Sequence, residues 1–465
     1  MCSRSSILLI SSVWAALLVG CLPEPAPNRP HPDGAFDSQD FMPERSALDV
    51  SVFSEEPSVS SDIARDATVL ADGTVIDSAM DTSVDRLSNH VGVFDSPARR
   101  ITADCGLACV ILASGSVYCW GAGSLHNGGT TVEERLRPRR IEGLRQIEQL
   151  STSCDVGCGV DRSQDVWCWG SNYVNLQTGS SDAYLNVARR RMDVTNISQV
   201  SMWTAAFLGR HADGALYLRL GSPEGLMRFS LPGSVIDLDA SHKYCVALST
   251  GNVACSGSDP ASSPVLVEGI DSAVSVTVGS YHYCALKRDG TVWCWGQNEY
   301  GQTGIAPEDS SQCPGMSFIY RENPAYPFHW CVPRPRQVPG LTDVAEVHAN
   351  ARTTCARKRD GTVWCWGYNG AGLVGDGLPT TEVCPSPPWN PASLTPPPVA
   401  CRRRPSRVAG LTDVISLAVG GVFGCALQST GAIWCWGAGG TLGNGTEVPS
   451  PVPVLVPASA PSRDE

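Results

Sequence analysis

Pairs of cysteines ten residues apart, separated by a turn and ending in Trp-Cys-Trp-Gly in the fullest copies, recur along the chain from about residue 93. The fullest copies span residues 284–296, 355–367 and 425–437, and further copies span 109–121 and 158–170. The copy at 245–257 keeps both cysteines, whereas the third unit has Leu208 and Leu218 at the same spacing. Seven units therefore begin near residues 109, 158, 208, 245, 284, 355 and 425, which predicts one repeat architecture.

Each unit has the pattern of a β-hairpin. Val, Trp and Cys favour strands, and the Asp-Gly pair that ends at Gly290 is typical of a tight turn with a left-handed glycine. The second unit has Gln164 in the turn instead, which predicts a strained or longer turn. The strands are apolar on both faces, as in sheets that stack against neighbours on each side. We therefore expect an all-β protein of radial blades, with Trp293 and Trp295 on one face of a strand and Cys294 on the other.

The cysteine spacing also predicts disulfides. Positions ten residues apart on a hairpin of this kind lie opposite each other, close enough for a cross-strand bond. Six units have such a pair: Cys109–Cys119, Cys158–Cys168, Cys245–Cys255, Cys284–Cys294, Cys355–Cys365 and Cys425–Cys435. In the third unit both positions are leucine, which supports pairing because the two partners change together. Zinc binding is the alternative, but no Cys-x-x-Cys motif accompanies these pairs.

The remaining cysteines lie outside the hairpins. We expect Cys313–Cys331 and Cys384–Cys401 each to staple an insertion, in the fifth and sixth units, and Cys105–Cys154 to join the first two blades. Cys2 lies in the predicted signal peptide and Cys21 at its end, so every other cysteine has a partner. Complete pairing indicates an oxidising compartment.

These units resemble the regulator of chromosome condensation repeat family. The similarity lies in Gly-x-x-His-x-Cys-Ala-Leu at 279–286, the Asp-Gly turn, Trp-Cys-Trp-Gly, Asn-x-x-Gly-Gln at 298–302 and Pro-x-x-Val-x-Gly-Leu at 335–341. The resemblance implies a seven-bladed β-propeller, which we assign to residues 93–457. It also implies that the chain ends meet in a shared closing blade, with residues 452–456 as the last strand beside the first unit. We expect residues 458–465 to form a flexible tail.

The N-terminal region has the features of a bacterial lipoprotein. Residues 1–20 combine Arg4 with an apolar run too short for a membrane span, and they end in Leu-Val-Gly before Cys21, which resembles a lipobox. The resemblance implies cleavage before Cys21 and acylation of this residue, and several acyl chains give a stable anchor. Leu22 at the next position favours the outer membrane. The alternative is ordinary secretion with an incidental Cys21.

The segment 21–92 differs in composition from the repeats. It holds 14 acidic residues and 4 arginines, with prolines crowded at its start. Such a segment buries too little apolar surface to offset its chain entropy. We therefore predict a disordered, self-repelling tether that holds the propeller away from the lipid surface.

The insertions, at about 305–333 and 378–401, are the best candidates for a binding site. Exposed aromatic side chains on rigid, stapled loops are typical binding anchors. The candidate aromatic residues are Tyr320, Tyr326, Phe328, Trp330 and Trp389, and Trp203 also lies off the repeat. The candidate arginines are Arg334, Arg336, Arg402, Arg403 and Arg404, which with arginines in earlier units would form a positive arc. The alternatives are that the tryptophans pack their own loops, and that the arginines are solvated or contact the tether.

The sequence contains no convincing catalytic, phosphate-binding or calcium-binding motif, and we expect no cofactor and no metal. A net charge of −12 disfavours a nucleic-acid partner. We expect a monomeric, non-enzymatic cell-envelope lipoprotein that binds a protein or an anionic envelope component through loops on one face. One alternative is guanine-nucleotide exchange, as in the founding member of the family, which would require a cytosolic location. The other is an envelope enzyme with carboxylates or His in the propeller channel.

Overall fold

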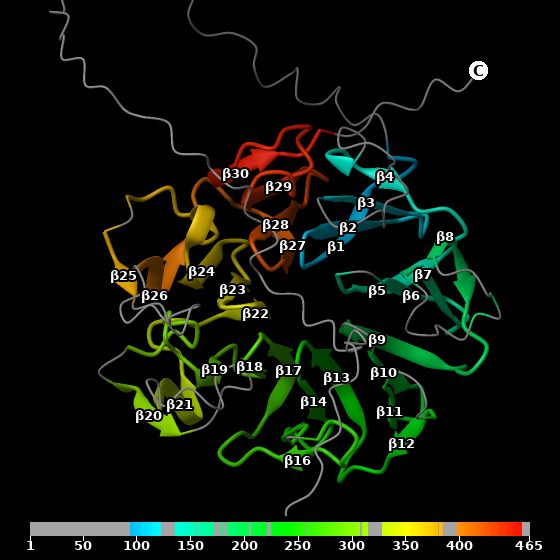
Figure 1. The fold of residues 1–465 in the computed structure, drawn as a ribbon, viewed down its shortest axis with the longest axis horizontal. Helices are drawn as coiled ribbons and strands as arrows, with labels where there is room; N and C mark the ends of the chain where they lie inside the picture. Colours follow the sequence, from blue (N-terminus) through cyan, green and yellow to red (C-terminus); the bar gives the residue numbers. More distant parts are fainter. Residues whose placement is uncertain are drawn as a thin grey trace, which may run out of the picture. The chain divides into compact units, whose positions relative to one another are not determined.

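A computed structural model describes residues 94–457 apart from 122–134, 155, 172–177, 179, 181–183, 204–205, 221–224, 258, 307–308, 315–327, 380 and 385–397. The predictions for residues 1–20, Cys21, the tether and the tail therefore lie outside the described residues. Seven antiparallel sheets follow one another along the chain and surround a common axis (Figure 1). The structure confirms the all-β, seven-bladed propeller. No helix in the described part of the chain has the length and apolar character needed to span a membrane.

Each sheet is one blade, and its strands run in chain order from the axis outwards, except that the added strand is outermost in blades 5 and 6. Blade 1 contains β1 (Ala98–Asp104), β2 (Leu107–Leu112), β3 (Val117–Gly121) and β4 (Arg139–Arg140). Blade 2 contains β5 (Ile147–Thr152), β6 (Val156–Asp161), β7 (Val166–Ser171) and β8 (Tyr184–Arg190). Blade 3 contains β9 (Ile197–Trp203), β10 (Ala206–His211), β11 (Leu216–Arg219) and β12 (Met227–Phe229). Blade 4 contains β13 (Val235–Ala240), β14 (Tyr244–Leu248), β15 (Val253–Cys255) and β16 (Val265–Leu266).

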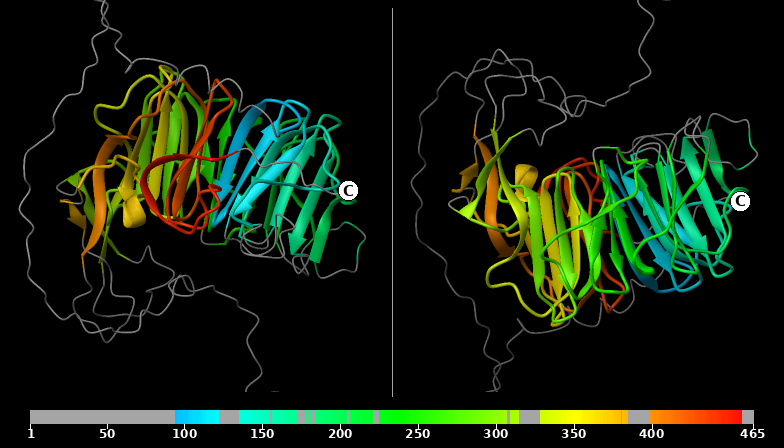
Figure 2. Two further views of the ribbon diagram at one scale, coloured as in Figure 1. Left: turned by 90° about the horizontal axis from the view of Figure 1, so that it is seen from above. Right: turned by 90° about the horizontal axis from the view of Figure 1, so that it is seen from below.

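The last three blades include the two that carry insertions. Blade 5 contains β17 (Ala273–Val278), β18 (His282–Lys287), β19 (Val292–Gln297), β20 (Ser311–Pro314) and β21 (Phe328–Gln337). Blade 6 contains β22 (Val344–Asn350), β23 (Thr353–Lys358), β24 (Val363–Tyr368), the 3-10 helix η2 (Gly370–Gly372), β25 (Val383–Cys384) and β26 (Val399–Arg407). Blade 7 contains β27 (Val414–Val419), β28 (Phe423–Gln428), β29 (Ile433–Gly437) and β30 (Ser450–Leu455). Figure 2 shows the strands of successive blades standing side by side around the ring.

The repeat motif forms the second and third strands of each blade. In blade 5, Cys284 and Cys294 are directly opposite in the register of β18 and β19, with Cα atoms 4.1 Å apart, and they form a disulfide. The six hairpin pairs and the three others are the nine disulfides that the cysteine spacing predicts. In blade 3, Leu208 and Leu218 face each other at the equivalent position and are fully buried.

Side-chain alternation gives each blade two different faces. Cys284 and Cys294 pack toward blade 6 in one apolar cluster, which includes Trp366 of that blade. Trp295, on the opposite face of β19, packs toward blade 4 in a second cluster. Six of the blades therefore place a hairpin disulfide on one side, and blade 3 has two leucines at the equivalent positions. Five of the units place a tryptophan on the other side. This apolar packing on both faces explains why the strands lack the alternation of a half-exposed sheet.

The hairpin turn is tight in every unit, with or without glycine. Gly290 has a φ of +81°, and its N–H donates to the Lys287 carbonyl over 2.9 Å. Gln164 keeps the same turn with a φ of +64°, and its N–H donates to the Asp161 carbonyl over 2.9 Å. The turn is therefore strained rather than longer, because the left-handed region is unfavourable for a residue with a Cβ atom.

We expect the Gln164→Gly substitution to raise the free energy of unfolding by about 1 kcal/mol, because glycine adopts a positive φ without steric cost. The measurement is chemical denaturation of the variant beside the wild type. Ser163→Gly in the same turn is the control, since Ser163 has no positive φ and should lose stability instead. A loss of stability in both variants would contradict the assigned strain.

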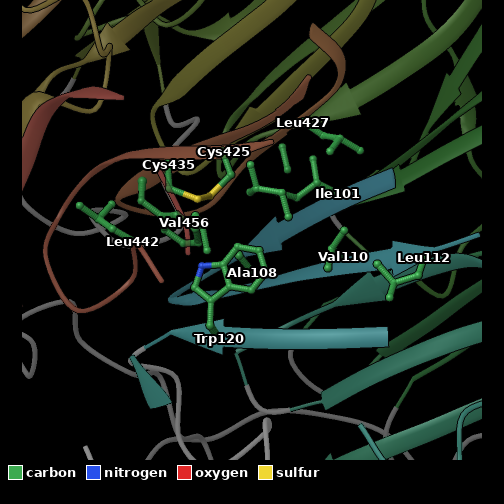
Figure 3. Close-up of a cluster of buried hydrophobic side chains, with 13 residues drawn as sticks. Ile101, Ala108, Val110, Leu112, Trp120, Cys425, Leu427, Cys435, Leu442 and Val456 are labelled. Atoms are coloured by element: carbon green, nitrogen blue, oxygen red, sulfur yellow. A yellow bond between two sulfur atoms is a disulfide. The ribbon is translucent and has the colours of Figure 1, made fainter. Parts of the chain in front are cut away.

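The ring closes in a way that the family resemblance did not predict. β30 pairs with β29 of its own blade, and blade 1 is built entirely from residues 98–140. The expectation of a shared closing blade is therefore wrong. Val456 does lie beside the first unit, but by packing: Figure 3 shows it with Leu442 close to the indole of Trp120. The interface between blades 7 and 1 thus uses the same kind of apolar packing as the others, so no strand exchange is needed.

The fourth unit lacks the repeat tryptophans, and an aromatic residue of blade 3 packs against it instead. Ser256 stands where Trp295 stands in blade 5, and its hydroxyl accepts a hydrogen bond from the Tyr244 N–H over 3.1 Å. The rings of Tyr244 and Trp203 lie 6.1 Å apart in the core between blades 3 and 4, and Trp203 is 9% exposed. Trp203 is therefore a core residue, and the interpretation of it as a binding anchor is wrong.

Candidate functional site

The two insertions widen the outer edges of blades 5 and 6, which are neighbours in the ring (Figure 1). β20 pairs with β21 and β25 pairs with β26, so each insertion adds a fifth strand to its blade. Cys313–Cys331 and Cys384–Cys401 fasten these added strands. We call the outermost strands of these two blades, β20, β21, β25 and β26, the extended edge.

The extended edge carries the candidate residues that the structure describes. Trp330 lies on β21 opposite Gln312, and its side chain is 41% exposed. Phe328 begins the same strand. Tyr320, Tyr326 and Trp389 lie outside the described residues. An exposed tryptophan on a strand held by a disulfide fits a binding anchor, because little conformational entropy remains to be lost on binding.

The candidate arginines at the extended edge mostly meet nearby carboxylates or carbonyls. Arg334 lies 3.5 Å from Glu268 of blade 4, and both side chains are exposed. Arg336 donates to the Asp309 carbonyl over 2.7 Å, and Arg403 donates to the Val383 carbonyl over 3.1 Å. Arg404 is exposed on β26. Arg336 and Arg403 also lie 3.9 and 3.7 Å from the carboxylates of Asp309 and Glu382. These partners within the chain favour the interpretation of the arginines as surface residues without a ligand role.

Arg402 is not a surface residue, which corrects its assignment as a partner-binding arginine. Its side chain is 10% exposed, and its Nε donates to Asp376 Oδ2 over 2.6 Å. The remaining nitrogens donate to the carbonyls of Cys401, Leu378 and Pro379. All three guanidinium nitrogens are therefore engaged within the chain, and the side chain ties β26 to the loop after η2.

A second candidate site is the central channel, a cavity of about 730 Å³ lined by the innermost strand of every blade. Its polar side chains are largely engaged in hydrogen bonds between neighbouring blades. Gln149 accepts from the Val200 N–H over 2.9 Å, and Asp237 accepts from the Val276 N–H over 3.0 Å. Two residues further along the inner strands, a second set of side chains makes the same kind of contact. Ser151 accepts from the Met202 N–H, Asp239 from the Val278 N–H, and Thr277 from the Ala349 N–H. These contacts give the channel lining a structural role.

The sequence analysis did not predict these hydrogen bonds between the inner strands, although the sequence carries a signal for them. A polar or charged residue stands nine residues before the first cysteine position of most units, as Gln149, Gln199 and Glu346 do. Each side chain at this position points to the axis, because the inner strands are in register around the ring. A polar residue at a fixed offset from the motif therefore indicates a channel contact.

The most strongly perturbed titratable groups of the channel lie on blades 1, 4 and 6. Burial raises the pKa of Asp104 to about 6, although the Asn350 side chain and the Cys105 N–H donate to it. Burial likewise raises the pKa of Asp239 to about 6. Burial acts to lower the pKa of His348, but the hydrogen bond and charge of Glu346, 2.9 Å away, outweigh it and raise that pKa. No group of three His, Cys, Asp or Glu residues within the described ranges has the geometry of a metal site.

The hairpins that build the blades match a known repeat family. Models of the regulator of chromosome condensation (RCC1) repeat match residues 273–302 and 344–372, and a second RCC1 model matches 289–356. These matches fall on blades 5 and 6, whose hairpins repeat in all seven sheets. The protein is an RCC1-repeat β-propeller. The matched segments include the hairpins of both extended blades and β20, but not β25.

Several proteins are similar to this RCC1-repeat propeller over part of its length. The mitochondrial RCC1 domain-containing protein RUG3 of Arabidopsis thaliana is 26% identical over 39% of this chain and 47% of its own length. The human E3 ubiquitin-protein ligase HERC2 is 23% identical over 51% of this chain and 5% of its own length. The chain thus spans less than half of these two relatives. Yeast RCC1 (Prp20), solved in complex with Kap60, has a TM-score of 0.59 with 15% identity, covering 87% of this chain and 92% of Prp20.

These channel groups make the stability of the RCC1-repeat propeller depend on pH. The folded pKa of Asp104 and that of Asp239 exceed the unfolded value of 3.8, so the folded protein binds more protons between about pH 4 and 6. His348, whose pKa is also raised, adds stability below its unfolded pKa that is lost as pH rises. Glu346, whose pKa is lowered, contributes stability that is lost only as the pH falls from its unfolded pKa of 4.5 through its folded pKa.

We therefore expect the free energy of unfolding to rise by about 1–2 kcal/mol when the pH falls from 7.5 to 5.5. Denaturant unfolding at the two pH values measures the difference. The Asp104→Asn, Asp239→Asn double variant should lose most of this gain, whereas Asp289→Asn at an exposed turn should keep it. Equal stability at both pH values in the wild type would show that these carboxyl groups are not titrating as described.

Proposed function

We propose that this RCC1-repeat propeller is a non-enzymatic binding module of the cell envelope, exported by residues 1–20 and anchored by lipid at Cys21. Its proposed partner is a protein, held at the extended edge. The observation that carries the proposal is that blades 5 and 6 have a fifth strand, fastened by its own disulfide, beside an exposed Trp330. A second structure of Prp20p from Saccharomyces cerevisiae, with a TM-score of 0.58, belongs to a protein with binding properties to Gsp1p and histones, which supports protein binding as a use of this fold.

The channel favours binding over catalysis in this proposal. Its carboxylates and hydroxyls accept backbone N–H groups of the next blade, so moving them toward a substrate would break contacts between blades. Glu346 is held by both His348 and Arg357, at 2.9 Å from each. Burial between the blades accounts for the raised pKa values of Asp104 and Asp239, and the contact with Glu346 accounts for that of His348, so no reaction is needed to explain them.

The site is tested by capture of envelope proteins with the full-length chain. The Trp330→Ala variant should lose a partner that the wild type retains, because the indole is an exposed aromatic surface on β21. Val265→Ala on β16 is the matched control, since Val265 is 66% exposed on the outermost strand of the neighbouring blade. Equal recovery of every captured protein by the wild type and Trp330→Ala would place the site elsewhere.

The anchor is tested separately by membrane fractionation. The Cys21→Ser variant should move from the membrane fraction to the soluble fraction and should incorporate no labelled fatty acid, because serine offers no thiol for acylation. Cys2→Ser is the control, since Cys2 lies within the predicted signal and should not affect the anchor. Membrane partition of Cys21→Ser with acyl label retained would refute the anchor while leaving the extended edge untouched.

A further inference from the structure

One disulfide differs from the other eight in both place and exposure. Cys105–Cys154 joins blade 1 to blade 2, whereas each of the others lies within a single blade. Cys154 is exposed and Cys105 is half-buried. The hairpin cysteines are buried in the core except for half-buried Cys255, and the four cysteines of the insertions are also buried. A reductant can therefore reach exposed Cys154 in the folded protein, whereas no other disulfide has an exposed cysteine.

The turn that contains Cys105 is connected to three other blades. Cys105 has a φ of +42°, in the left-handed region that favours glycine. Its carbonyl accepts a hydrogen bond from the Gly421 N–H of blade 7 over 3.1 Å, and its own N–H donates to Asp104. Asp104 in turn accepts from the Asn350 side chain of blade 6 over 2.7 Å. With the bond to Cys154 of blade 2, the turn links blade 1 to blades 2, 6 and 7.

The interface beside this turn is where the ring closes, and it lacks an indole hydrogen bond that two equivalent interfaces have. Trp366 and Trp436 each donate their indole N–H to a carbonyl of the preceding blade, over 2.9 and 2.8 Å. Trp120, the equivalent residue between blades 7 and 1, is fully buried, and its Nε1 has no acceptor among the described residues. A buried donor without a partner costs stability. The packing shown in Figure 3 therefore closes the ring without this hydrogen bond.

We propose that Cys105–Cys154 is a redox-sensitive clasp, which a dithiol reductant opens while the hairpin disulfides remain intact, and that its opening loosens the joint between blades 7 and 1. In the exchange, a thiolate of the reductant attacks one sulfur of the pair, and the other sulfur leaves as a thiolate. The second thiol of the reductant then attacks the mixed disulfide. The protein gains two electrons and two protons as two thiols, and the reductant becomes a disulfide. Release of the bond frees Cys105 to leave its left-handed conformation, which weakens the Gly421 contact.

The order of reduction tests the first half of the proposal. Purified full-length protein is treated with graded dithiothreitol under native conditions, alkylated, and mapped by mass spectrometry. Cys105 and Cys154 should be labelled on the order of 100-fold faster than the hairpin cysteines, because the latter require opening of the blades. Simultaneous or earlier labelling of a hairpin pair would overturn the clasp.

Hydrogen exchange tests the second half. In the selectively reduced wild type, and in the Cys105→Ala, Cys154→Ala double variant, amides of β1 and β27 should exchange about tenfold faster than in the oxidised protein, while those of β14 should not change. The Cys313→Ala, Cys331→Ala double variant is the control, because it removes a disulfide confined to one blade. Unchanged exchange at β1 and β27 in the reduced wild type would overturn the conformational role, even if the double variant failed to fold.

Discussion

The Trp366→Ala substitution is expected to lower the free energy of unfolding by about 3–5 kcal/mol, the range for truncating a buried tryptophan. Trp366 is 0% exposed and lies between blades 5 and 6. Its indole N–H donates to the Gln302 carbonyl over 2.9 Å, and the substitution would leave this carbonyl without its donor. Alanine would leave a cavity that rigid stacked sheets cannot readily fill, so the loss should approach the upper end.

Trp364→Ala in the same strand is the matched control for Trp366→Ala. Trp364 is half-buried, and its indole N–H donates to the Thr362 hydroxyl over 3.2 Å near the surface. Its truncation should cost about 1–2 kcal/mol, since part of the ring already contacts solvent. Denaturant unfolding of both variants measures the two changes in the free energy of unfolding. If Trp366→Ala lowered the free energy of unfolding no more than Trp364→Ala does, the result would contradict the view that tryptophans buried between blades hold the blades together.

The local elements of this fold could be predicted because their signals are local. The ten-residue cysteine spacing fits one hairpin, and the alternation of Trp295 and Cys294 follows from the pleat of a single strand. The left-handed turn at Gln164 could be foreseen for the same reason, since the turn is set by residues adjacent in sequence. Seven such units left a ring as the simplest way to bury both faces of every sheet.

The contacts that join distant segments could not be predicted in this way. Closure depends on whether β30 pairs with β29 or with blade 1, and its sequence alone is compatible with either neighbour. Burial of Arg402 depends on Asp376, which lies in a loop 26 residues earlier, so the residue looks like its exposed neighbours in sequence. Trp203 packs beside Tyr244 of blade 4, the blade that has Ser256 where five other blades have tryptophan. Each of these features is a property of the assembled ring.

The Arg402–Asp376 pair supplies the second large expected effect. Asp376 is held by three groups: Arg402 Nε at 2.6 Å, the Ser406 hydroxyl at 2.9 Å and the Leu378 N–H at 3.1 Å. Burial acts to raise the pKa of Asp376, but these bonds outweigh it and lower that pKa, so the carboxylate is charged at neutral pH. Asp376→Ala leaves a buried guanidinium without its counter-charge, and we expect it to lower the free energy of unfolding by about 3–5 kcal/mol.

Two further variants separate charge burial from the loss of an ordinary ion pair. Glu382→Ala removes the half-exposed partner that lies 3.7 Å from Arg403, and it should cost less than about 1 kcal/mol because water screens that pair. The Asp376→Leu, Arg402→Met double variant removes both buried charges together and should recover most of the stability lost in Asp376→Ala, since the cost lies in the uncompensated charge. Denaturant unfolding of the three variants distinguishes the two cases: equal losses in Asp376→Ala and Glu382→Ala would mean that Arg402 reaches solvent and remains available to a partner, whereas the expected order assigns it to the joint between β26 and the loop that follows η2.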